Sequence, residues 1–223
     1  MVTLTALRYY RTFGTRLVDI LIRPARPEDA EAAVPLIYSS GPAAFDYVFT
    51  HQTHLPATGY LRRALEYPNG EFGYRHHVVV ELDGEVVGAG ASFSGRDALG
   101  FMPTALRQIF GWYGLIGGAR VSRRGLQVER VVQVPKGDLH YISHLGVSPE
   151  LRGHGIGRKL VDHLIELGRA KGRTLAALDV SVENPRAQAL YERIGFTVTS
   201  ELVSKLDNDT ARVPNHRRME VRL

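Results

Sequence analysis

The sequence contains no cysteine, and that absence excludes several kinds of chemistry. Disulfide frameworks, thiolate zinc sites and cysteine nucleophiles all require this residue. The nine histidines are the only soft metal ligands that remain. The composition is consistent with a reducing compartment.

Long apolar runs are missing from the start of the chain as well. In residues 1–24 arginines interrupt every apolar stretch, so neither a secretory signal nor a run of about 20 apolar residues is present there. We therefore expect a cytoplasmic protein that does not contact a membrane. Residues 1–18 are expected to be an N-terminal extension. The sequence leaves open whether this extension is an amphipathic element, an oligomer contact or a segment without fixed structure.

Acidic residues are in the minority, with 23 Asp and Glu against 28 Lys and Arg and a net charge of +5. This excess favours an anionic partner. The basic residues do not gather into one stripe, and few exposed aromatic residues lie among them to stack on bases. A phosphorylated small molecule satisfies the charge equally well, and we expect no nucleic-acid partner.

The length of 223 residues and the hydrophobic content of 44% suit one elaborated domain. We expect a single domain over residues 19–223 with an insertion at about 95–130. That insertion is predicted to hold a helix over 103–116, which the glycine pair 117–118 would end. Its aromatic residues would help to shape a substrate pocket, together with residues 45–60.

The first half of the chain predicts a strand followed by helices. Residues 19–25 are β-rich, and a Pro-Glu-Asp sequence at 27–29 begins a helix. Pro35 predicts a kink or break in that helix. A Gly-Pro pair at 41–42 separates it from a second helical region, which is best formed over 57–67.

The other elements follow from turn residues and hydrophobic periodicity. An Asp-Gly pair at 83–84 predicts a β-hairpin over 77–92. The remaining expected elements are strands at 126–134, 139–147, 174–182, from 196 onward and at 217–223, and helices at 156–170 and after Asn184-Pro185.

A glycine-rich turn, Arg152-Gly153-His154-Gly155-Ile156-Gly157, lies between a predicted strand and a predicted helix. Free backbone N–H groups at such a helix N-terminus can bind phosphate oxygens. The spacing is not that of a P-loop, which needs G-x-x-x-x-G-K-[ST], or of a dinucleotide fingerprint, which needs G-x-G-x-x-G. A glycine-rich loop without a ligand is the remaining alternative.

Two motifs together resemble the GNAT superfamily of acyl-CoA N-acyltransferases. The turn is similar to its Q/R-x-x-G-x-G/A pyrophosphate motif. Residues 184–196, NPRAQALYERIGF, are similar to its N-x-x-A-x-x-L-Y-x-x-x-G-F signature. The close resemblance covers residues 139–198.

The resemblance implies an α/β fold with a mixed, largely antiparallel sheet flanked by helices and splayed at the fourth strand, 139–147. It implies transfer of the acetyl group of acetyl-CoA to a primary amine by direct attack. We favour a small-molecule amine over a peptide amine as acceptor. A CoA-binding sensor or scaffold with weak activity and a protein N-terminal or lysine acetyltransferase are the alternatives. Homodimerisation stays open.

The resemblance also assigns the cofactor-binding residues. In the strand, backbone groups would hold the pantetheine arm; in the turn, N–H donors would hold the pyrophosphate. The assigned residues are Leu145, Gly146, Val147, Arg152, Gly153, His154, Gly155, Ile156, Gly157, Arg158, Asn184 and Tyr191. Arg158 and Lys159 could equally be solvated helix residues, and Asn184 could be only a helix N-cap.

Tyr191 occupies the family's acid position, from which a phenol can donate a proton to the leaving sulfur. Tyr141 stands where histone-type members carry a glutamate, which leaves the base open. Glu129, His140 and His144 are further candidates, and we name Tyr191, Tyr141 and Glu129 as the catalytic set. Strand alternation predicts one face for Tyr141, Ser143, Leu145 and Val147 and the other face for His144 and Gly146. We expect no metal, because the H-x-x-x-H spacing of His140 and His144 falls on a strand without a third ligand.

Overall fold

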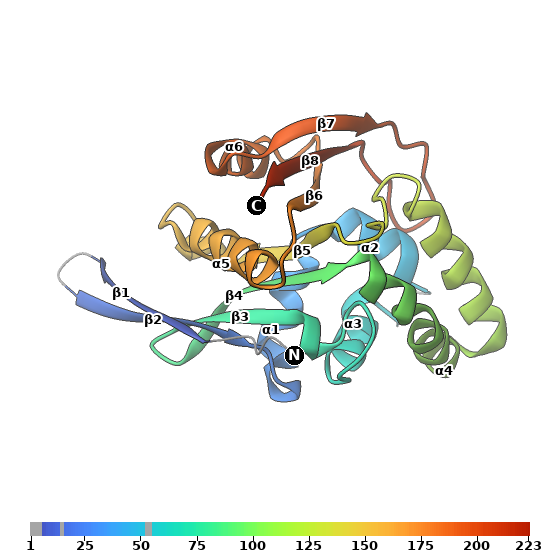
Figure 1. Cartoon of the computed structure of the whole chain (residues 1–223). Helices are drawn as coiled ribbons and strands as arrows, with labels where there is room; N and C mark the ends of the chain where they lie inside the picture. Colours follow the sequence, from blue (N-terminus) through green and yellow to red (C-terminus); the bar gives the residue numbers. More distant parts are fainter. Residues whose placement is uncertain (1–5, 14–15, 52–54) are drawn as a thin grey trace.

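The computed structural model describes residues 6–13, 16–51 and 55–223. They form one eight-stranded sheet in the order β1-β2-β3-β4-β5-β6-β8-β7 (Figure 1). All neighbouring strands are antiparallel except β5 and β6. The strands are β1 (Leu7–Phe13), β2 (Arg16–Pro24), β3 (His77–Leu82), β4 (Glu85–Ser94), β5 (His140–Val147), β6 (Leu175–Ser181), β7 (Thr197–Leu202) and β8 (His216–Arg222). This confirms the predicted fold class.

Helices cover both faces of the sheet. They are α1 (Ala30–Tyr38), α2 (Pro42–Phe49), α3 (Ala57–Leu65), α4 (Gly95–Val128), α5 (Ile156–Ala170) and α6 (Pro185–Ile194). Successive side chains of strand β3 point to opposite faces of the sheet. Val79 packs with α1–α3 on one face, and Val78 and Val80 pack with α5 on the other. None of the helices in the described ranges has the length and apolarity that a bilayer crossing requires.

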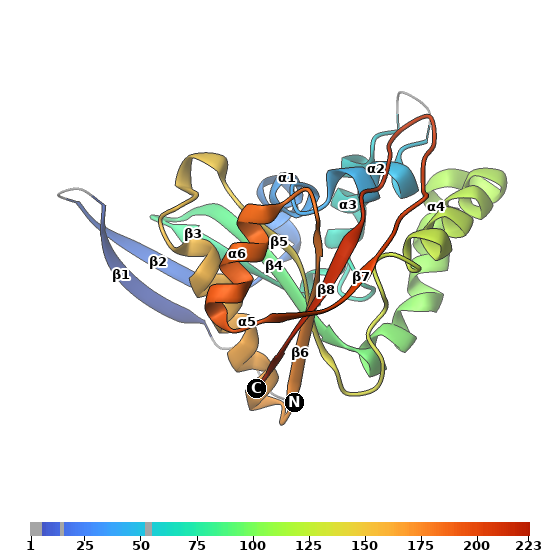
Figure 2. The same cartoon turned by 90° about the horizontal axis from the view of Figure 1, so that it is seen from above.

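The N-terminal residues add a strand that the sequence left undecided. Strand β1 pairs along its length with β2, and this hairpin extends from one end of the molecule (Figures 1 and 2). The ammonium group of Lys159 in α5 lies 3.9 Å above the ring of Tyr9. This cation–π contact joins the hairpin to the rest of the domain.

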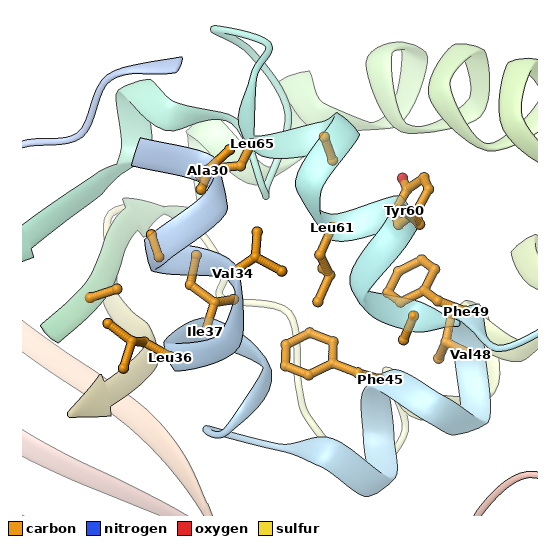
Figure 3. Close-up of a cluster of buried hydrophobic side chains, with 14 of the residues drawn as sticks. Ala30, Val34, Leu36, Ile37, Phe45, Val48, Phe49, Tyr60, Leu61 and Leu65 are labelled. Atoms are coloured by element: carbon orange, nitrogen blue, oxygen red, sulfur yellow. The ribbon is translucent and has the colours of Figure 1, made fainter. Parts of the chain in front are cut away.

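The first helix begins where the Pro-Glu-Asp sequence predicts, through a short 3-10 turn at Pro27–Asp29. The expected break at Pro35 is wrong, because α1 continues through this residue to Tyr38. A proline inside a helix removes one N–H donor. In this short helix that loss is tolerated, since the apolar face of α1 is buried between the sheet and α3. Figure 3 shows the side chains of α1, α2 and α3 converging in that core.

The segment at 95–130 is one long helical element, α4, and it differs from the prediction at both ends. The helix starts with Ser94, whose hydroxyl caps Asp97 N, well before the predicted start at 103. It bends at Gly114, where φ is 69° and ψ is −175°, and the pair 117–118 does not end it. Gly118 is instead required for close packing, because a Cβ there would lie 2.7 Å from the Phe110 ring.

The strand predicted at 126–134 is wrong. Residues up to Val128 complete α4, and the N–H groups of Val131 and Val132 both donate to the Val128 carbonyl. The valines in this run have high β propensity, but their main-chain groups close a turn and are not available to a neighbouring strand. An irregular connection then leads to β5.

The C-terminal half agrees with the predictions. Helix α5 ends with Gly172 in the left-handed conformation after the C-cap, and α6 lies between its N-cap Asn184 and its C-cap Gly195. Strand β5 pairs with β6 only at residues 140–141 and 176–177. Both strands continue beyond these pairs without bonding to each other, so the predicted splay is present.

Candidate active site

Strand β5 contains a bulge in its splayed half. Residues 143 and 146 of β5 pair with residues 91 and 89 of β4, so β5 has one more residue than its partner in this interval. His144 lies in the bulge with a φ of 56°, which is uncommon for a residue other than glycine. The extra residue reverses the alternation of side chains beyond it.

The prediction that Leu145 and Val147 share the face of Tyr141 and Ser143 is therefore wrong. Leu145 and Val147 pack on the α5 face together with Ile142. The predicted separation of these two residues from His144 and Gly146 is present, because His144 and Gly146 face α1–α3. Gly146 has no room for a side chain, because a Cβ would lie 2.0 Å from the carbonyl oxygen of Leu36 in α1. The bulge thus brings an imidazole to the side of the sheet opposite α5.

The glycine-rich turn follows directly after this strand. Gly153 and Gly155 both have positive φ, 86° and 80°, and α5 begins with Ile156. The turn therefore exposes consecutive N–H groups at the positive end of the helix dipole, which is a suitable site for an anion. The side chain of Arg152 folds back onto the strand. Its Nε donates to the Val147 carbonyl at 3.0 Å, and this hydrogen bond joins the turn to β5.

The cations predicted near the turn are engaged with other groups. Arg158 forms an ion pair with Asp162 at 3.5 Å, and Lys159 lies over Tyr9. His154 is exposed on the turn. Arg158 and Lys159 thus make ordinary contacts of side chains on a helix surface.

One cation that the sequence did not single out lies beside the turn. The Nη2 atom of Arg186 is 3.4 Å from the position that a Cβ on Gly153 would occupy. Arg186 is in the first turn of α6, held there by Asn184, whose side chain accepts a hydrogen bond from Ala187 N. In the second motif, position 186 can be any residue. The motif therefore could not identify Arg186 as a phosphate-binding residue.

Tyr191 is buried in α6, with 8% of its surface exposed and its ring 6.1 Å from that of Phe196. Burial raises the pKa of its phenol to about 12. The group is therefore neutral at pH 7 and able to donate a proton. Its packing among the residues between α5, α6 and the sheet fixes the direction of the ring.

Tyr141 has a different environment from the one expected of a base. Its hydroxyl donates to Asp179 at 2.7 Å, and Arg218 donates to the same carboxylate oxygen at 2.8 Å. Burial and the neighbouring carboxylate hold the pKa of Tyr141 well above its ordinary value. This buried network joins β5 to β6 and β8 at the closed end of the splay.

Two of the other candidate bases also have clear positions. His140 is buried, and its Nε2 lies 2.8 Å from the Leu164 carbonyl; burial lowers its pKa to about 4. Glu129 is exposed at the end of α4, and partial burial raises its pKa. The catalytic roles of Tyr191, Tyr141 and Glu129 stay predictions.

A carboxylate that sequence reasoning missed lies next to His144. Glu71, in the loop before β3, has its Oε1 atom 3.7 Å from His144 Nε2. Nearly half of its side chain, 45%, is exposed, but burial of its surroundings and the charge of Glu129 raise its pKa to about 7. No local pattern identifies Glu71, because it meets His144 only across 73 positions of sequence.

The residues present fit a CoA-type ligand. The turn offers an anion cradle, and the splayed half of β5 has main-chain groups without a partner on the β6 side. Ser143 Oγ in this half is buried and has no hydrogen-bond partner in the described part of the chain. No group of three possible metal ligands gathers among the described residues. A hollow of about 590 Å³ at the bend of α4 is lined by none of these residues.

Residues 45–196 match the sequence profile of the acetyltransferase (GNAT) family. This match spans more than half of the chain, and the protein belongs to that family.

The curated relatives match only part of the chain. Mycothiol acetyltransferase of Beutenbergia cavernae is 44% identical over 66 residues, which are 30% of this chain and 22% of that protein. The 5-NmdU N-acetyltransferase of Pseudomonas phage PaMx11 is 36% identical over 74 residues, 33% of this chain and 49% of the relative. The chain therefore spans at most about half the length of these relatives.

Solved structures agree with the fold over most of the chain. An N-acetyltransferase from Staphylococcus aureus Mu50 superposes with a TM-score of 0.62 at 22% identity, covering 90% of this chain and 99% of that one. The acetyltransferase yncA from Salmonella typhimurium, solved with its cofactor acetyl-CoA, gives a TM-score of 0.52 at 19% identity, covering 92% and 94%.

Proposed function

We propose that the protein transfers the acetyl group of acetyl-CoA to the primary amine of a small molecule by direct attack of the amine. The observation that carries this proposal is the left-handed glycine turn at the start of α5, placed next to the splayed half of β5. Together they offer an anion site and an unpaired strand edge in one continuous stretch of chain.

In this proposal the backbone does most of the binding. The N–H groups of residues 153–157 hold the pyrophosphate, and the guanidinium of Arg186 adds a positive charge beside them. The main-chain groups of residues 142–147, which have no partner in β6, hold the pantetheine arm as a neighbouring strand would, and Ser143 Oγ is available to the same ligand. Positioning of this kind can lower a barrier by roughly 7 to 11 kcal/mol.

Tyr191 acts as the general acid in this proposal. Acetyl-CoA supplies the acetyl thioester when it is bound. The phenol of Tyr191 keeps its proton at neutral pH because its pKa is about 12, and it donates to the leaving sulfur as the C–S bond of the thioester breaks and the C–N bond forms. The phenol is then reprotonated from solvent.

A small acceptor is favoured by the way the far side of the site is built. Helix α4 and the loop 203–215 both attach to α2: Arg124 donates to the Thr50 carbonyl at 3.1 Å, and Thr210 Oγ1 donates to the Asp46 carbonyl at 2.9 Å. These contacts hold α4 and the loop 203–215 against α2, and a protein substrate would have to fit beside them. The name of the mycothiol relative supports the same choice.

The cofactor assignment is tested by isothermal titration with acetyl-CoA and with free CoA. We expect micromolar binding by the wild type. Gly155→Glu should weaken it at least ~100-fold, because the side chain strains a left-handed position and places a negative charge in the anion site. Gly172→Glu is the matched control, since it has the same kind of φ at the other end of α5 and should bind normally. Absence of binding by the wild type would contradict the proposal.

Transfer is tested by the release of free thiol from acetyl-CoA with three acceptors: 2-phenylethylamine, 1,4-diaminobutane and a peptide with N-terminal alanine. We expect the small amines to be acetylated faster than the peptide. Faster reaction of the peptide would support a protein acetyltransferase. Tight acetyl-CoA binding without transfer to any of them would support the CoA-binding sensor.

A further inference from the structure

Three side chains form a line from the core to the protein surface beside the β5 bulge. His77 Nδ1 lies 3.0 Å from the Gly73 carbonyl, and His77 Nε2 lies 3.1 Å from His144 Nδ1. The two imidazole rings are nearly parallel. Beyond them, His144 Nε2 faces Glu71 Oε1 at 3.7 Å.

The carbonyl at the inner end determines where the protons lie. A carbonyl oxygen can only accept, so His77 Nδ1 must carry the hydrogen. Burial holds His77 neutral, with a pKa of about 4, so its Nε2 is an acceptor and His144 Nδ1 must donate to it. His144 is also buried, and its neutral form then has a free lone pair on Nε2. That lone pair points toward the carboxylate.

A lone pair and a carboxylate oxygen that face each other at 3.7 Å do not form a hydrogen bond. When Glu71 is ionised, both atoms are acceptors, so they lack a donor between them. A primary ammonium group has three N–H donors and can donate to both atoms at once. The pair therefore offers a receptor for the kind of group that an N-acetyltransferase must bind.

The surroundings make Glu71 the member that a substrate can reach. Its side chain is 45% exposed, against 8% for that of His144. The rings of Phe72 and Phe45 lie 5.0 Å and 6.0 Å from the imidazole and shield it from solvent. The ligand would therefore approach from the Glu71 side.

The titratable groups around this pair are few. They are His77 from β3, Glu129 at the end of α4, Tyr60 from α3 and Tyr141 of β5. Glu129 is the only further carboxylate among these groups. Its negative charge adds to that of Glu71, which favours a cationic amine over an amino acid with a free carboxylate.

We propose that Glu71 Oε1 and His144 Nε2 bind the ammonium group of the acceptor and that Glu71 takes its proton, with His77 as the positioning residue that fixes the tautomer of His144. This inference rests on the proposed function. In the step, one N–H bond of the ammonium breaks and one O–H bond forms on Glu71, which frees the nitrogen lone pair for attack. Glu71 returns the proton to solvent.

The kinetic test compares Glu71→Gln with Glu66→Gln, an exposed glutamate at the end of α3. With 2-phenylethylamine and 1,4-diaminobutane at pH 7.5, Glu71→Gln should lower kcat about 10²- to 10³-fold. Its acetyl-CoA affinity and that of the control should match the wild type. The deficit should narrow toward pH 9.5, because the amine then arrives partly deprotonated. A Glu71→Gln enzyme with wild-type kcat would overturn the proposal.

A second measurement does not depend on turnover. Spectra of the wild type with ¹⁵N-labelled histidine, with His144→Gln used to assign the signals, should show His144 protonated on Nδ1 with an unprotonated Nε2. Addition of 1,4-diaminobutane should shift the Nε2 signal in the wild type and much less in Glu71→Gln. A hydrogen on Nε2 overturns the arrangement whether or not any amine is acetylated. Lack of transfer by the wild type would instead count against the proposed function.

Discussion

Arg186 is one residue whose role follows from its place in the structure alone. Its guanidinium lies beside Gly153, where it can add a charge-assisted hydrogen bond to a bound phosphate. We predict that Arg186→Gln raises the Kd for acetyl-CoA about three- to tenfold. The effect should shrink at high ionic strength, because the arginine is exposed. Isothermal titration at two salt concentrations measures both quantities.

Arg193 provides the matched control, since it is exposed on the same helix and its substitution removes the same charge. Arg193→Gln should change the Kd by less than about twofold, because its side chain is at the other end of α6. Equal effects of the two substitutions would mean that Arg186 acts through net charge and makes no local contact.

The sequence predicted the roles of those residues whose conformation depends on a short stretch of chain. The left-handed conformations of Gly153 and Gly155 and the N-cap role of Asn184 are local, so the motifs contained them. Glu71 and His144 meet across the fold, and the pairing depends on a bulge that reverses the alternation of β5. No periodicity in the sequence marks that bulge.

Helix α4 gives a test at the scale of one element. Gly114 has φ 69° and ψ −175°, a conformation that costs a residue with a Cβ of order 1–3 kcal/mol. We predict that Gly114→Ala lowers the free energy of unfolding by this amount. Gly111→Ala should instead raise it by up to ~1 kcal/mol, because Gly111 is in the same helix, has open space around it and gains helix propensity. Urea denaturation of both variants measures the difference.

A matching response of the two variants would mean that the bend of α4 does not depend on the conformation of Gly114. The glycine pair 117–118 explains why the end of this helix was mispredicted. The pair has the composition of a helix end, yet both glycines are buried inside the helix. Their lack of side chains serves contacts with Tyr113 and Phe110, which composition alone cannot distinguish from a stop signal.

At the scale of the whole molecule, the order of elements was largely predictable. Asp83-Gly84 specifies a hairpin, and the glycine turn and α6 are placed by their motifs. The splay was predicted through family resemblance, while the sequence left the role of β1 open. The splay depends on which distant strands become neighbours, and such pairing is encoded in no short segment. Strand β1 instead pairs with the strand that follows it along the chain.

The sheet also buries several histidines in neutral form, which predicts how the stability of the fold responds to acid. Burial lowers the pKa of His77 and His140 to about 4 and that of His144 well below its ordinary value. Between pH 6.5 and pH 4 the unfolded chain therefore binds more protons at these sites than the folded chain. The free energy of unfolding should fall as pH falls through this window, by on the order of 1 kcal/mol per pH unit for each such group.

Glu71 acts in the opposite direction, because its raised pKa lets the folded state bind a proton between about pH 4.5 and pH 7. The raised pKa values of Glu129 and Asp179 act in the same direction as that of Glu71, while the lowered pKa values of His76, His163 and His216 add to the effect of the three histidines. Urea denaturation at pH 7.5, 6.0 and 5.0 should show a falling midpoint. His140→Gln should flatten this slope by about one proton, whatever its stability at pH 7.5. A midpoint that is constant over this range would mean that the three buried imidazoles accept protons in the folded state as readily as in the unfolded chain.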